Sequence, residues 1–320
     1  MKRFALPAAV VAGALMLTGC SADQQSSKES SPSATDTAVT LEHPSEKGLS
    51  ISFDKKPEKL VMDCYAYSSL EGYGLKPDAL FGYDCDNPSV MGDLDISGIQ
   101  RIGKDGEIDM EKLAEIKPDA VIGQGSEKGW SWFDDDVNAQ LKKVSTFVPL
   151  ASGDSVDQEI KETRELAEFF GGDVDTEQIA QDDKDYEQAK KDFAAAAKDK
   201  NLNYMLTSPT KETLYTAVGF PQADLLEDNG ATIVGAEPPA KGNPWGAVAW
   251  EKASEYPADV ILMENYSKDT PFSTEMWDGL PAVKADQLGA WSSKGAMTAR
   301  HYADWLEDVT DLTKSAKKVS

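Results

Sequence analysis

The chain has few of the residues with which proteins bind metal ions or clamp anions. Its 320 residues include only 2 His, and these are far apart in the sequence, at His43 and His301. Arginine is also rare and occurs at Arg3, Arg101, Arg164 and Arg300. Metal sites need clustered ligands, and Arg is the usual bidentate partner of carboxylates and phosphates. We therefore expect no metal site, and a highly anionic ligand would find few clamps.

Positive charge is scarce in the chain as a whole. The formal net charge is −24 at pH 7, and it becomes −26 once Lys2 and Arg3 are removed with an N-terminal signal. Such a surface repels nucleic acid and anionic lipid headgroups, so we expect neither as a partner. The main role of this charge is solubility, and a secondary consequence is that it favours a neutral or cationic ligand.

Signature motifs of enzymes are also missing. Gly123 and Gly125 begin a G-x-G pattern, but the next glycine, Gly129, comes one position too late for a dinucleotide fingerprint. Ser126 does not lie in a G-x-S-x-G elbow, and no Walker sequence occurs. We expect no catalytic residues, so the chain is not predicted to be an enzyme. The alternatives are a secreted carbohydrate-active enzyme, for which aromatic loops and nearby Asp residues would bind sugar, and a surface adhesin.

The N-terminus resembles a bacterial lipoprotein signal. Lys2 and Arg3 precede an apolar stretch at 5–17 that is too short to span a membrane, and it ends in Leu-Thr-Gly before Cys20. The resemblance implies a signal peptide at residues 1–19, lipidation of Cys20 and anchoring to the extracytoplasmic face of the cell membrane. An ordinary secretory signal is the alternative. The Ser-rich residues 20–47 are predicted to be a disordered tether.

The other two cysteines are Cys64 and Cys85, and each follows a predicted strand. In an oxidising compartment they would form a disulfide between neighbouring loops. A metal pair has no support, because no His or third Cys lies near either one in the sequence. A reactive thiol is the weaker alternative, and we favour the disulfide.

One short pattern occurs twice, 140 residues apart. When 108–122 (IDMEKLAEIKPDAVI) and 249–262 (AWEKASEYPADVIL) are aligned, the pairs Glu111/Glu251, Lys112/Lys252, Glu115/Glu255 and Asp119/Asp259 coincide. Each copy reads as a helix, a short turn and a buried strand. Strands alternating with helices predict an α/β fold with two lobes, each with a mostly parallel central sheet.

A long polar helix is predicted between the two halves. Ile179, Tyr186 and Phe193 recur every seven residues and would share one face of it. We predict an N-terminal lobe at 48–174, a connecting backbone helix at 175–200 and a C-terminal lobe at 201–320. A peripheral helix of one lobe is the alternative interpretation of 175–200.

The order of motifs resembles one known family. The motifs are Pro57–Val61, Leu75–Pro77, the segment 103–122, Leu280–Ala285 and Trp291 followed by a final helix. They are similar to substrate-binding lipoproteins of ABC importers that carry ferric siderophores, cobalamin or haem. The resemblance implies two lobes around a ligand cleft and one surface Glu per lobe that docks on the permease subunits; Glu111 and Glu251 match those positions. Without the resemblance, both would be helix-start residues stabilised by the helix dipole.

The loops expected at the carboxyl ends of the strands are rich in aromatic residues, and such loops face the ligand in open parallel sheets. The predicted ligand-binding residues are Tyr65, Tyr67, Tyr83, Arg101, Trp130, Trp132, Tyr215, Trp245, Trp250, Tyr266, Trp291 and Arg300. Some of the Trp residues are expected to be ordinary packing residues, and about half of the aromatic residues are expected to contact the ligand. This lining suits a bulky, partly apolar ligand held by stacking. We expect a monomer that binds an iron(III)–siderophore complex, with a hydroxamate chelate favoured and no resident cofactor. Cobalamin and haem are the alternatives.

Overall fold

The first of two larger sheets is five-stranded and entirely parallel. The computed structural model describes residues 37–239, 243–269 and 271–320. The sheet has the order β11-β8-β3-β4-β5. Its strands are β3 (Leu60–Asp63), β4 (Ala79–Phe81), β5 (Gln100–Arg101), β8 (Ala120–Gly123) and β11 (Thr146–Pro149). The strands β3, β4 and β8 are buried along their whole length, as expected of a parallel sheet covered on both faces.

Short helices follow the strands of this first lobe. They are α1 (Cys64–Leu70), the 3-10 turn η1 (Glu71–Tyr73), α2 (Pro88–Met91), α3 (Met110–Ile116) and α4 (Asp135–Val144). Each α-helix begins after an Asp or Asn whose side chain accepts a backbone N–H of the first turn. Two small hairpins complete the loops: β6 (Gly103–Lys104) pairs with β7 (Glu107–Ile108), and β9 (Gly125–Ser126) pairs with β10 (Gly129–Trp130).

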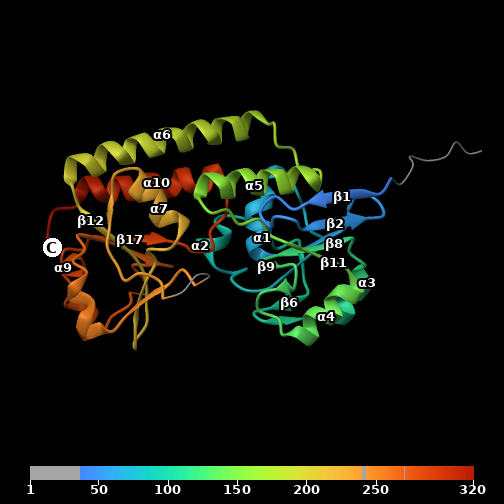
Figure 1. The fold of residues 1–320 in the computed structure, drawn as a ribbon, viewed down its shortest axis with the longest axis horizontal. Helices are drawn as coiled ribbons and strands as arrows, with labels where there is room; N and C mark the ends of the chain where they lie inside the picture. The colour runs from blue at the N-terminus through green and yellow to red at the C-terminus, as the bar shows by residue number, and fades with distance from the viewer. Residues whose placement is uncertain (1–36, 240–242, 270) are drawn as a thin grey trace, which may run out of the picture. The chain divides into compact units, whose positions relative to one another are not determined.

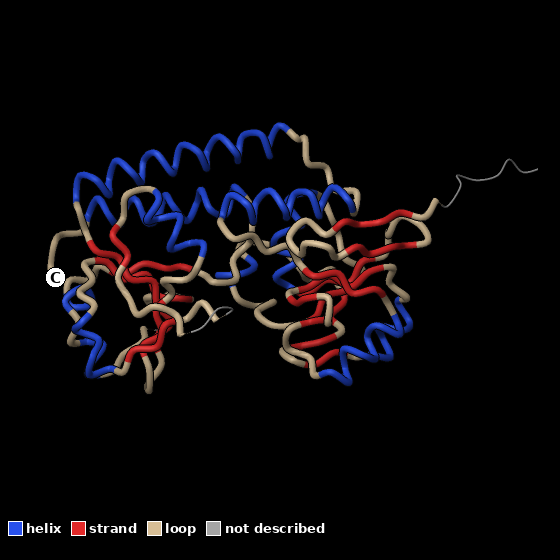
Figure 2. Tube along the Cα trace, in the orientation of Figure 1, coloured by secondary structure: helices blue, strands red, loops and turns tan. Residues whose placement is uncertain are grey.

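The second sheet has six strands and is mixed. Its order is β15-β13-β12-β16-β17, with β14 also paired to β12. The strands are β12 (Asn203–Pro209), β13 (Leu214–Thr216), β14 (Thr232–Ile233), β15 (Gly246–Val248), β16 (Val260–Glu264) and β17 (Leu288–Trp291). The pairings of β12 with β14 and β16, and of β16 with β17, are parallel, and β13 and β15 add an antiparallel edge. Both sheets with their covering helices are seen in Figure 2.

Around the second sheet lie α7 (Pro221–Asp228), the 3-10 segment η2 (Trp250–Glu255), α8 (Glu275–Asp278), α9 (Pro281–Lys284) and the C-terminal α10 (Ala299–Ser315). The predicted α/β fold with two mostly parallel sheets is therefore confirmed. The predicted second repeat helix is a 3-10 segment, whereas the first is the α-helix α3.

Two helices connect the hydrophobic cores of the two lobes. In α6 (Glu177–Lys200), Ile179 packs in the core of the first lobe, whereas Tyr186 and Phe193 pack in that of the second. The helix α5 (Val156–Phe169) also contributes to both cores. Figure 1 shows α6 alongside α10, against which it packs. The seven-residue spacing therefore marked the buried face of a long connecting helix, as predicted.

Aspartates that precede strands tie the amino ends of neighbouring strands together. Asp119, before β8, accepts hydrogen bonds from the N–H groups of Glu58 and Lys59 at 2.9 Å each. Asp259, before β16, accepts one from Asn203 at 2.8 Å. Asp119 and Asp259, the fourth coincident pair of the sequence repeat, thus have the same structural role in the two lobes.

The predicted boundary of the disordered tether is wrong, because a hairpin of β1 (Val39–Glu42) and β2 (Ser50–Phe53) begins inside it. Residues 39–42 were assigned to it, but they form a strand paired with β2. Just after β1, His43 is buried: its Nε2 donates to the Pro149 carbonyl at 2.9 Å, and its Nδ1 accepts N–H groups of Ser45 and Glu46. The predicted signal peptide, Cys20 and the rest of the tether up to 36 lie outside the described residues. No helix in the described part of the chain is long and apolar enough to span a membrane.

Candidate ligand-binding cleft

Asp63, at the carboxyl end of β3, organises the loops of the first lobe. Its Oδ1 accepts the Ala66 N–H at the start of α1, and its Oδ2 accepts the Gln124 N–H and the Trp130 indole N–H, each at 2.7 Å. A side chain at Gly123 would collide with Asp63 and Trp130, so this approach requires glycine. Burial raises the pKa of Asp63 to about 6 despite these hydrogen bonds.

An aromatic group stands at this carboxyl edge. The Trp132 ring lies 5.7 Å from the Tyr65 ring and 5.5 Å from the Tyr83 ring, measured between centroids. The Tyr65 hydroxyl donates to Asp84. Cys64 and Cys85 form a disulfide with Cα atoms 5.2 Å apart, as favoured from the sequence, and it joins the start of α1, which carries Tyr65, to the loop that carries Tyr83. The rings are therefore held on a cross-linked support.

Loops of the second lobe reach over this aromatic group. The Lys294 ammonium, in the loop after β17, lies 5.1 Å from the Trp132 ring centre and 5.5 Å from that of Tyr65. Asn87 donates to Asn265 at 3.4 Å, and the Met297 N–H donates to the Ser69 hydroxyl at 3.1 Å. The carboxyl ends of the two sheets thus face each other, which is where α/β folds bind ligands.

A cavity of about 340 Å³ lies at this junction. It is lined by the loops that follow β8, β11 and β17, by the start of α7, and by Glu159 of α5 and Tyr302 of α10. The Tyr302 hydroxyl donates to Glu159 at 2.6 Å and accepts the Gln222 amide N–H at 3.3 Å. Burial raises the pKa of Glu159 to about 7, and the Tyr302 hydrogen bond lowers it less. The cavity therefore has a polar floor. The aromatic wall of Tyr65, Tyr83 and Trp132 is not part of its lining, but Lys294, which lines the cavity, lies over the rings of Tyr65 and Trp132.

Four of the aromatic residues predicted to bind ligand are core residues instead. Tyr67, Trp130, Trp250 and Trp291 expose between 1 and 8 % of their surface. The three indole N–H groups are satisfied internally, by Asp63, the Thr210 carbonyl and the Thr207 carbonyl respectively. Because the four rings are buried and the three indole N–H groups are paired, the prediction that these residues bind ligand is corrected. Tyr65 exposes only 1 %, but it is covered by Trp132 and Lys294 at the junction itself.

A second aromatic group lies on the other lobe. Trp245 is half-buried, and its ring centre lies 4.7 Å from that of Phe220, which lines the cavity. Tyr215 on β13 is exposed and meets Trp245 edge-on. Trp245 and Tyr215 therefore lie beside the cleft on the second lobe.

Arg101 and Tyr266 lie away from the cavity. Arg101, on the edge strand β5, forms an ion pair with Asp86 at 3.4 Å. Tyr266 lines a separate cavity of about 440 Å³ with Phe272 and Trp277.

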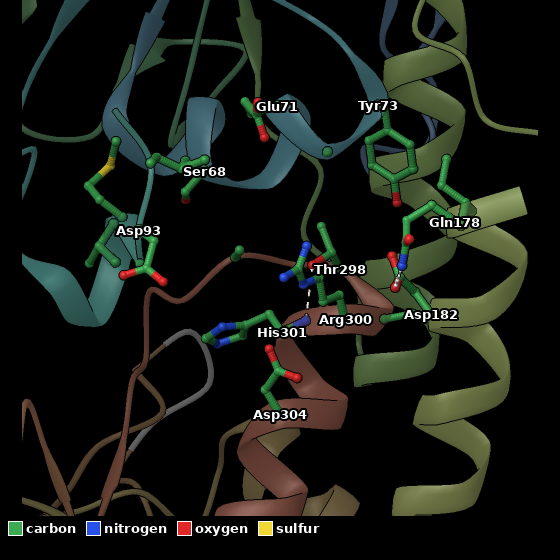
Figure 3. Close-up of a pocket in the computed structure, with 18 of the residues that line it drawn as sticks. Ser68, Glu71, Tyr73, Asp93, Gln178, Asp182, Thr298, Arg300, His301 and Asp304 are labelled. Carbon is green, nitrogen blue, oxygen red and sulfur yellow. Dashed lines mark hydrogen bonds between the residues drawn. The ribbon is translucent and has the colours of Figure 1, made fainter. Parts of the chain in front are cut away.

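Arg300 faces a different cavity, of about 480 Å³, on the helical side of the junction. Figure 3 shows Arg300, His301 and Asp304 of α10 entering it from one side and Glu71 and Tyr73 from the other. The structure therefore does not bring Arg300 together with the aromatic group of the cleft.

Glu111 and Glu251 are both exposed at the start of their helical segments. Glu111 is in the first turn of α3, whose N-cap is Asp109, and Glu251 is in the first turn of η2. No hydrogen bond or ion pair engages either carboxylate within the described residues. They are placed where a docking partner could reach them, and the favourable helix-start environment applies as well.

No group of three His, Cys, Asp or Glu side chains in the described residues has the arrangement of a metal site. His43 is engaged on both ring nitrogens as described above. Burial lowers the pKa of His301 to about 4.

The polar floor of the cavity was not predicted from the sequence. Glu159 lies on the buried face of α5, three residues after Val156 and four before Thr163. A carboxylate at a position where the helical period demands an apolar residue is the signal that would have revealed it. Lys294 and Phe220, in contrast, have no local pattern that separates them from ordinary loop residues.

A family model described as periplasmic binding protein matches residues 83–294. No curated protein sequence matches the chain. Among solved structures, the chain is similar to DesE of Streptomyces coelicolor, described as a ferric-siderophore receptor protein. The TM-score is 0.74 at 22 % identity, and the match covers 88 % of this chain and 99 % of DesE.

Two further solved structures share the fold. FhuD of Vibrio cholerae, a siderophore-binding protein solved with Fe³⁺–Desferal, matches with a TM-score of 0.60 at 19 % identity over 81 % of this chain and 99 % of that one. The petrobactin-binding protein YclQ of Bacillus subtilis matches with a TM-score of 0.62 at 15 % identity over 87 % and 99 %. At these identities the similarity establishes the fold.

Proposed function

The chain belongs to the periplasmic binding protein family, and on that premise we propose that it captures a ferric siderophore in the inter-lobe cleft. It would then deliver this ligand, without chemical change, to the permease subunits of an ABC importer. The observation that carries the proposal is the aromatic wall of Tyr65, Tyr83 and Trp132 at the facing carboxyl ends of the two sheets. The siderophore-binding proteins of the same fold support it.

A hydroxamate chelate is the favoured ligand. Ferric trihydroxamates are neutral or cationic, whereas catecholate and citrate chelates are strongly anionic. The cavity lining has one basic side chain, Lys294, and one acidic side chain, Glu159. Arg101 and Arg300, the two arginines expected to clamp an anionic chelate, lie outside that lining. Stacking on aromatic faces and a few hydrogen bonds would hold such a chelate.

Tryptophan fluorescence tests this proposal directly. The protein is titrated with ferrioxamine, ferrichrome, ferric enterobactin, haem and cobalamin, and we expect a ferric trihydroxamate to quench the emission with saturation. Trp132→Phe removes the fluorophore nearest the proposed ligand, so the quench should shrink. Trp277→Phe, at a buried site in another hydrophobic cluster, is the matched control. Saturable binding of haem or cobalamin, with no response to any ferric chelate, would replace the siderophore assignment.

We further propose that Glu111 and Glu251 dock on the permease. Their matched places at helix starts and their exposure support this role. In the variant Glu111→Ala/Glu251→Ala, ligand affinity should stay within about twofold, while uptake by cells that depend on this protein should fail. As a control, Glu115→Ala/Glu255→Ala changes the neighbouring repeat carboxylates, which are also exposed. Lost ligand affinity in the first variant would place the pair in the cleft instead.

Lipidation of Cys20, anchoring to the extracytoplasmic face of the membrane and a monomeric state are also proposed. The Leu-Thr-Gly-Cys sequence after an apolar stretch supports the first two. Metabolic labelling with a fatty-acid analogue, compared between the wild type and Cys20→Ser, tests the anchor. Sedimentation of the soluble part from residue 37 tests the monomer.

A further inference from the structure

The floor of the cleft cavity holds a buried carboxylate with an incomplete set of partners. Glu159 exposes 8 % of its surface, and only Oε2 receives a hydrogen bond from the described residues, that of Tyr302. Gln222 exposes 6 % and lines the same cavity, yet its Oε1 has no hydrogen-bond partner in the described part of the chain. Buried polar atoms are nearly always paired, so the unpartnered Gln222 Oε1 indicates a missing donor. Glu159 Oε1, a carboxylate oxygen with no protein donor at the same cavity, is a second acceptor for it.

The charge around this floor is also unbalanced. Glu162, one turn further along α5, exposes 5 % and carries a second buried carboxylate with an unpartnered Oε2. Neither Glu159 nor Glu162 forms an ion pair with any described residue. Lys294 is the one basic side chain in the cavity lining, and its ammonium lies over Trp132 and Tyr65. The missing donor should therefore be positively charged.

We propose that Glu159 and Gln222 bind a pendant ammonium group of the siderophore, so that the protein selects amine-bearing ferric hydroxamates over neutral ones. The inference rests on the proposed function and narrows its ligand class. The ammonium donates to the Glu159 carboxylate and to Gln222 Oε1, and the chelate lies against the aromatic wall. A primary ammonium has three donors, which matches two acceptors here and leaves one for water or a loop carbonyl.

Binding at this floor should release protons near neutral pH. Burial holds the pKa of Glu159 at about 7 in the free protein, and an adjacent ammonium would lower it. The other titratable groups that face Glu159 are Glu162 on α5, Tyr302 on α10, Tyr186 on α6 and Lys294 after β17. The pKa values of both tyrosines are raised, so they stay protonated in this range, and the proton comes from Glu159.

The test compares ferric desferrioxamine B, which has a pendant ammonium, with its N-acetylated form, which does not. Titration calorimetry at pH 8 should give about tenfold tighter binding of the ammonium form to the wild type, as expected of one charge-assisted hydrogen bond. At pH 7, buffers of different ionisation enthalpy should report proton release with the ammonium form only. In Glu159→Gln the two chelates should bind equally, whereas the matched control Glu162→Gln, outside the cavity lining, should retain the preference.

Each remaining outcome is informative. If both chelates bind the wild type tightly and equally, the inference is overturned while the proposed function stands. If the wild type prefers the ammonium form but Glu159→Gln keeps that preference, the ammonium binds elsewhere, for instance on the aromatic rings, and the assignment to Glu159 is wrong. If neither chelate binds, the hydroxamate proposal fails and the inference fails with it. The comparison of ligands on the wild type needs no variant to fold.

Discussion

Buried carboxylates at the two ends of the strands have pKa values shifted in opposite directions. At the amino ends, Asp259 is buried, and burial alone would raise its pKa, yet the N–H groups of Asn203, Val319 and Ser320 bring it down to about 2. At the carboxyl ends, burial dominates: the pKa of Asp63 rises to about 6, and that of Glu159 at the cavity rises to about 7.

The difference lies in the number and charge of the donors, because Asp259 is also bound by the Ser320 hydroxyl and by the Lys318 ammonium at 3.1 Å. Asp259 Oδ1 accepts hydrogen bonds from the Val319 and Ser320 N–H groups, and Oδ2 accepts one from Asn203, all between 2.7 and 2.8 Å. Glu159 receives one hydrogen bond, from a side chain. Asp259 is therefore fully compensated within the scaffold, Asp63 has three hydrogen bonds but no cation, and Glu159 at the cavity, where a ligand would bind, is the least compensated.

Removing Asp259, the carboxylate with the most hydrogen bonds, should lower the free energy of unfolding more than any other change considered. Asp259→Ala leaves several backbone N–H groups without an acceptor, so we expect a loss of about 4 kcal/mol in the free energy of unfolding. Urea denaturation followed by circular dichroism measures it. The control is Asp311→Ala, an exposed residue paired only with Lys314, for which the change should stay below about 0.5 kcal/mol. Similar losses in both variants would remove the special role of the amino ends.

At the carboxyl ends, removing the disulfide should cause the next largest loss of stability. Cys64 and Cys85 are 21 residues apart, so their pairing constrains the unfolded chain by about 3 kcal/mol. Cys64→Ser/Cys85→Ser should lower the melting temperature and also weaken ligand quenching, because helix α1 with Tyr65 and the loop with Tyr83 lose their link. Reductant should reproduce both effects in the wild type and leave the double variant unchanged. Undiminished quenching would mean that Asp63 alone holds the loops.

The pH dependence of stability distinguishes a carboxylate with a raised pKa, such as Glu159, from one with a lowered pKa, such as Asp259. The pKa of Glu159 is raised from 4.5 to about 7 on folding, so the folded state holds the proton more tightly. Stability should therefore fall as pH rises from about 4.5 to 7, by on the order of 2–3 kcal/mol for this group. Glu159→Gln should abolish that part of the slope, measured as the difference between wild-type and variant urea midpoints at each pH. An unchanged difference between pH 5 and 8 would contradict the raised pKa.

Asp119, the counterpart of Asp259 in the first lobe, should contribute least to stability. Burial would raise the pKa of Asp119, but the Lys59 and Glu58 N–H groups outweigh it and hold the pKa below its usual range. Its side chain is 22 % exposed, so water can replace the lost acceptor. We expect Asp119→Ala to cost about 1 kcal/mol, in the same urea assay. A loss equal to that of Asp259→Ala would show that exposure does not set the difference.

The alternation of helices and strands and the long connecting helix could be predicted because each leaves a local pattern. The Cys64–Cys85 disulfide could only be favoured from the expected oxidising compartment, because the distance between the two residues is a property of the folded chain. Aromatic residues in polar loops predicted the ligand-binding residues less well. Trp132 and Trp130 are two residues apart in the same loop, but Trp130 turns inward because Asp63 binds its indole N–H. Glu159, Gln222 and Tyr302 come from three helices that meet only in the folded chain, so no spacing along the sequence connects them.

Lys294 sets a threshold for any ligand that stacks on Tyr65 and Trp132. Its ammonium already occupies the faces of these rings, so the binding-competent population is the fraction of molecules in which Lys294 has moved away. The apparent dissociation constant is the intrinsic one divided by that fraction. Small aromatic or cationic solutes with weak intrinsic affinity are therefore excluded at ordinary concentrations, and a molecule with many simultaneous contacts is favoured. Lys294 would thus weaken the binding of every ring-stacking solute by the same factor, so that only a solute with many further contacts still binds at low concentration.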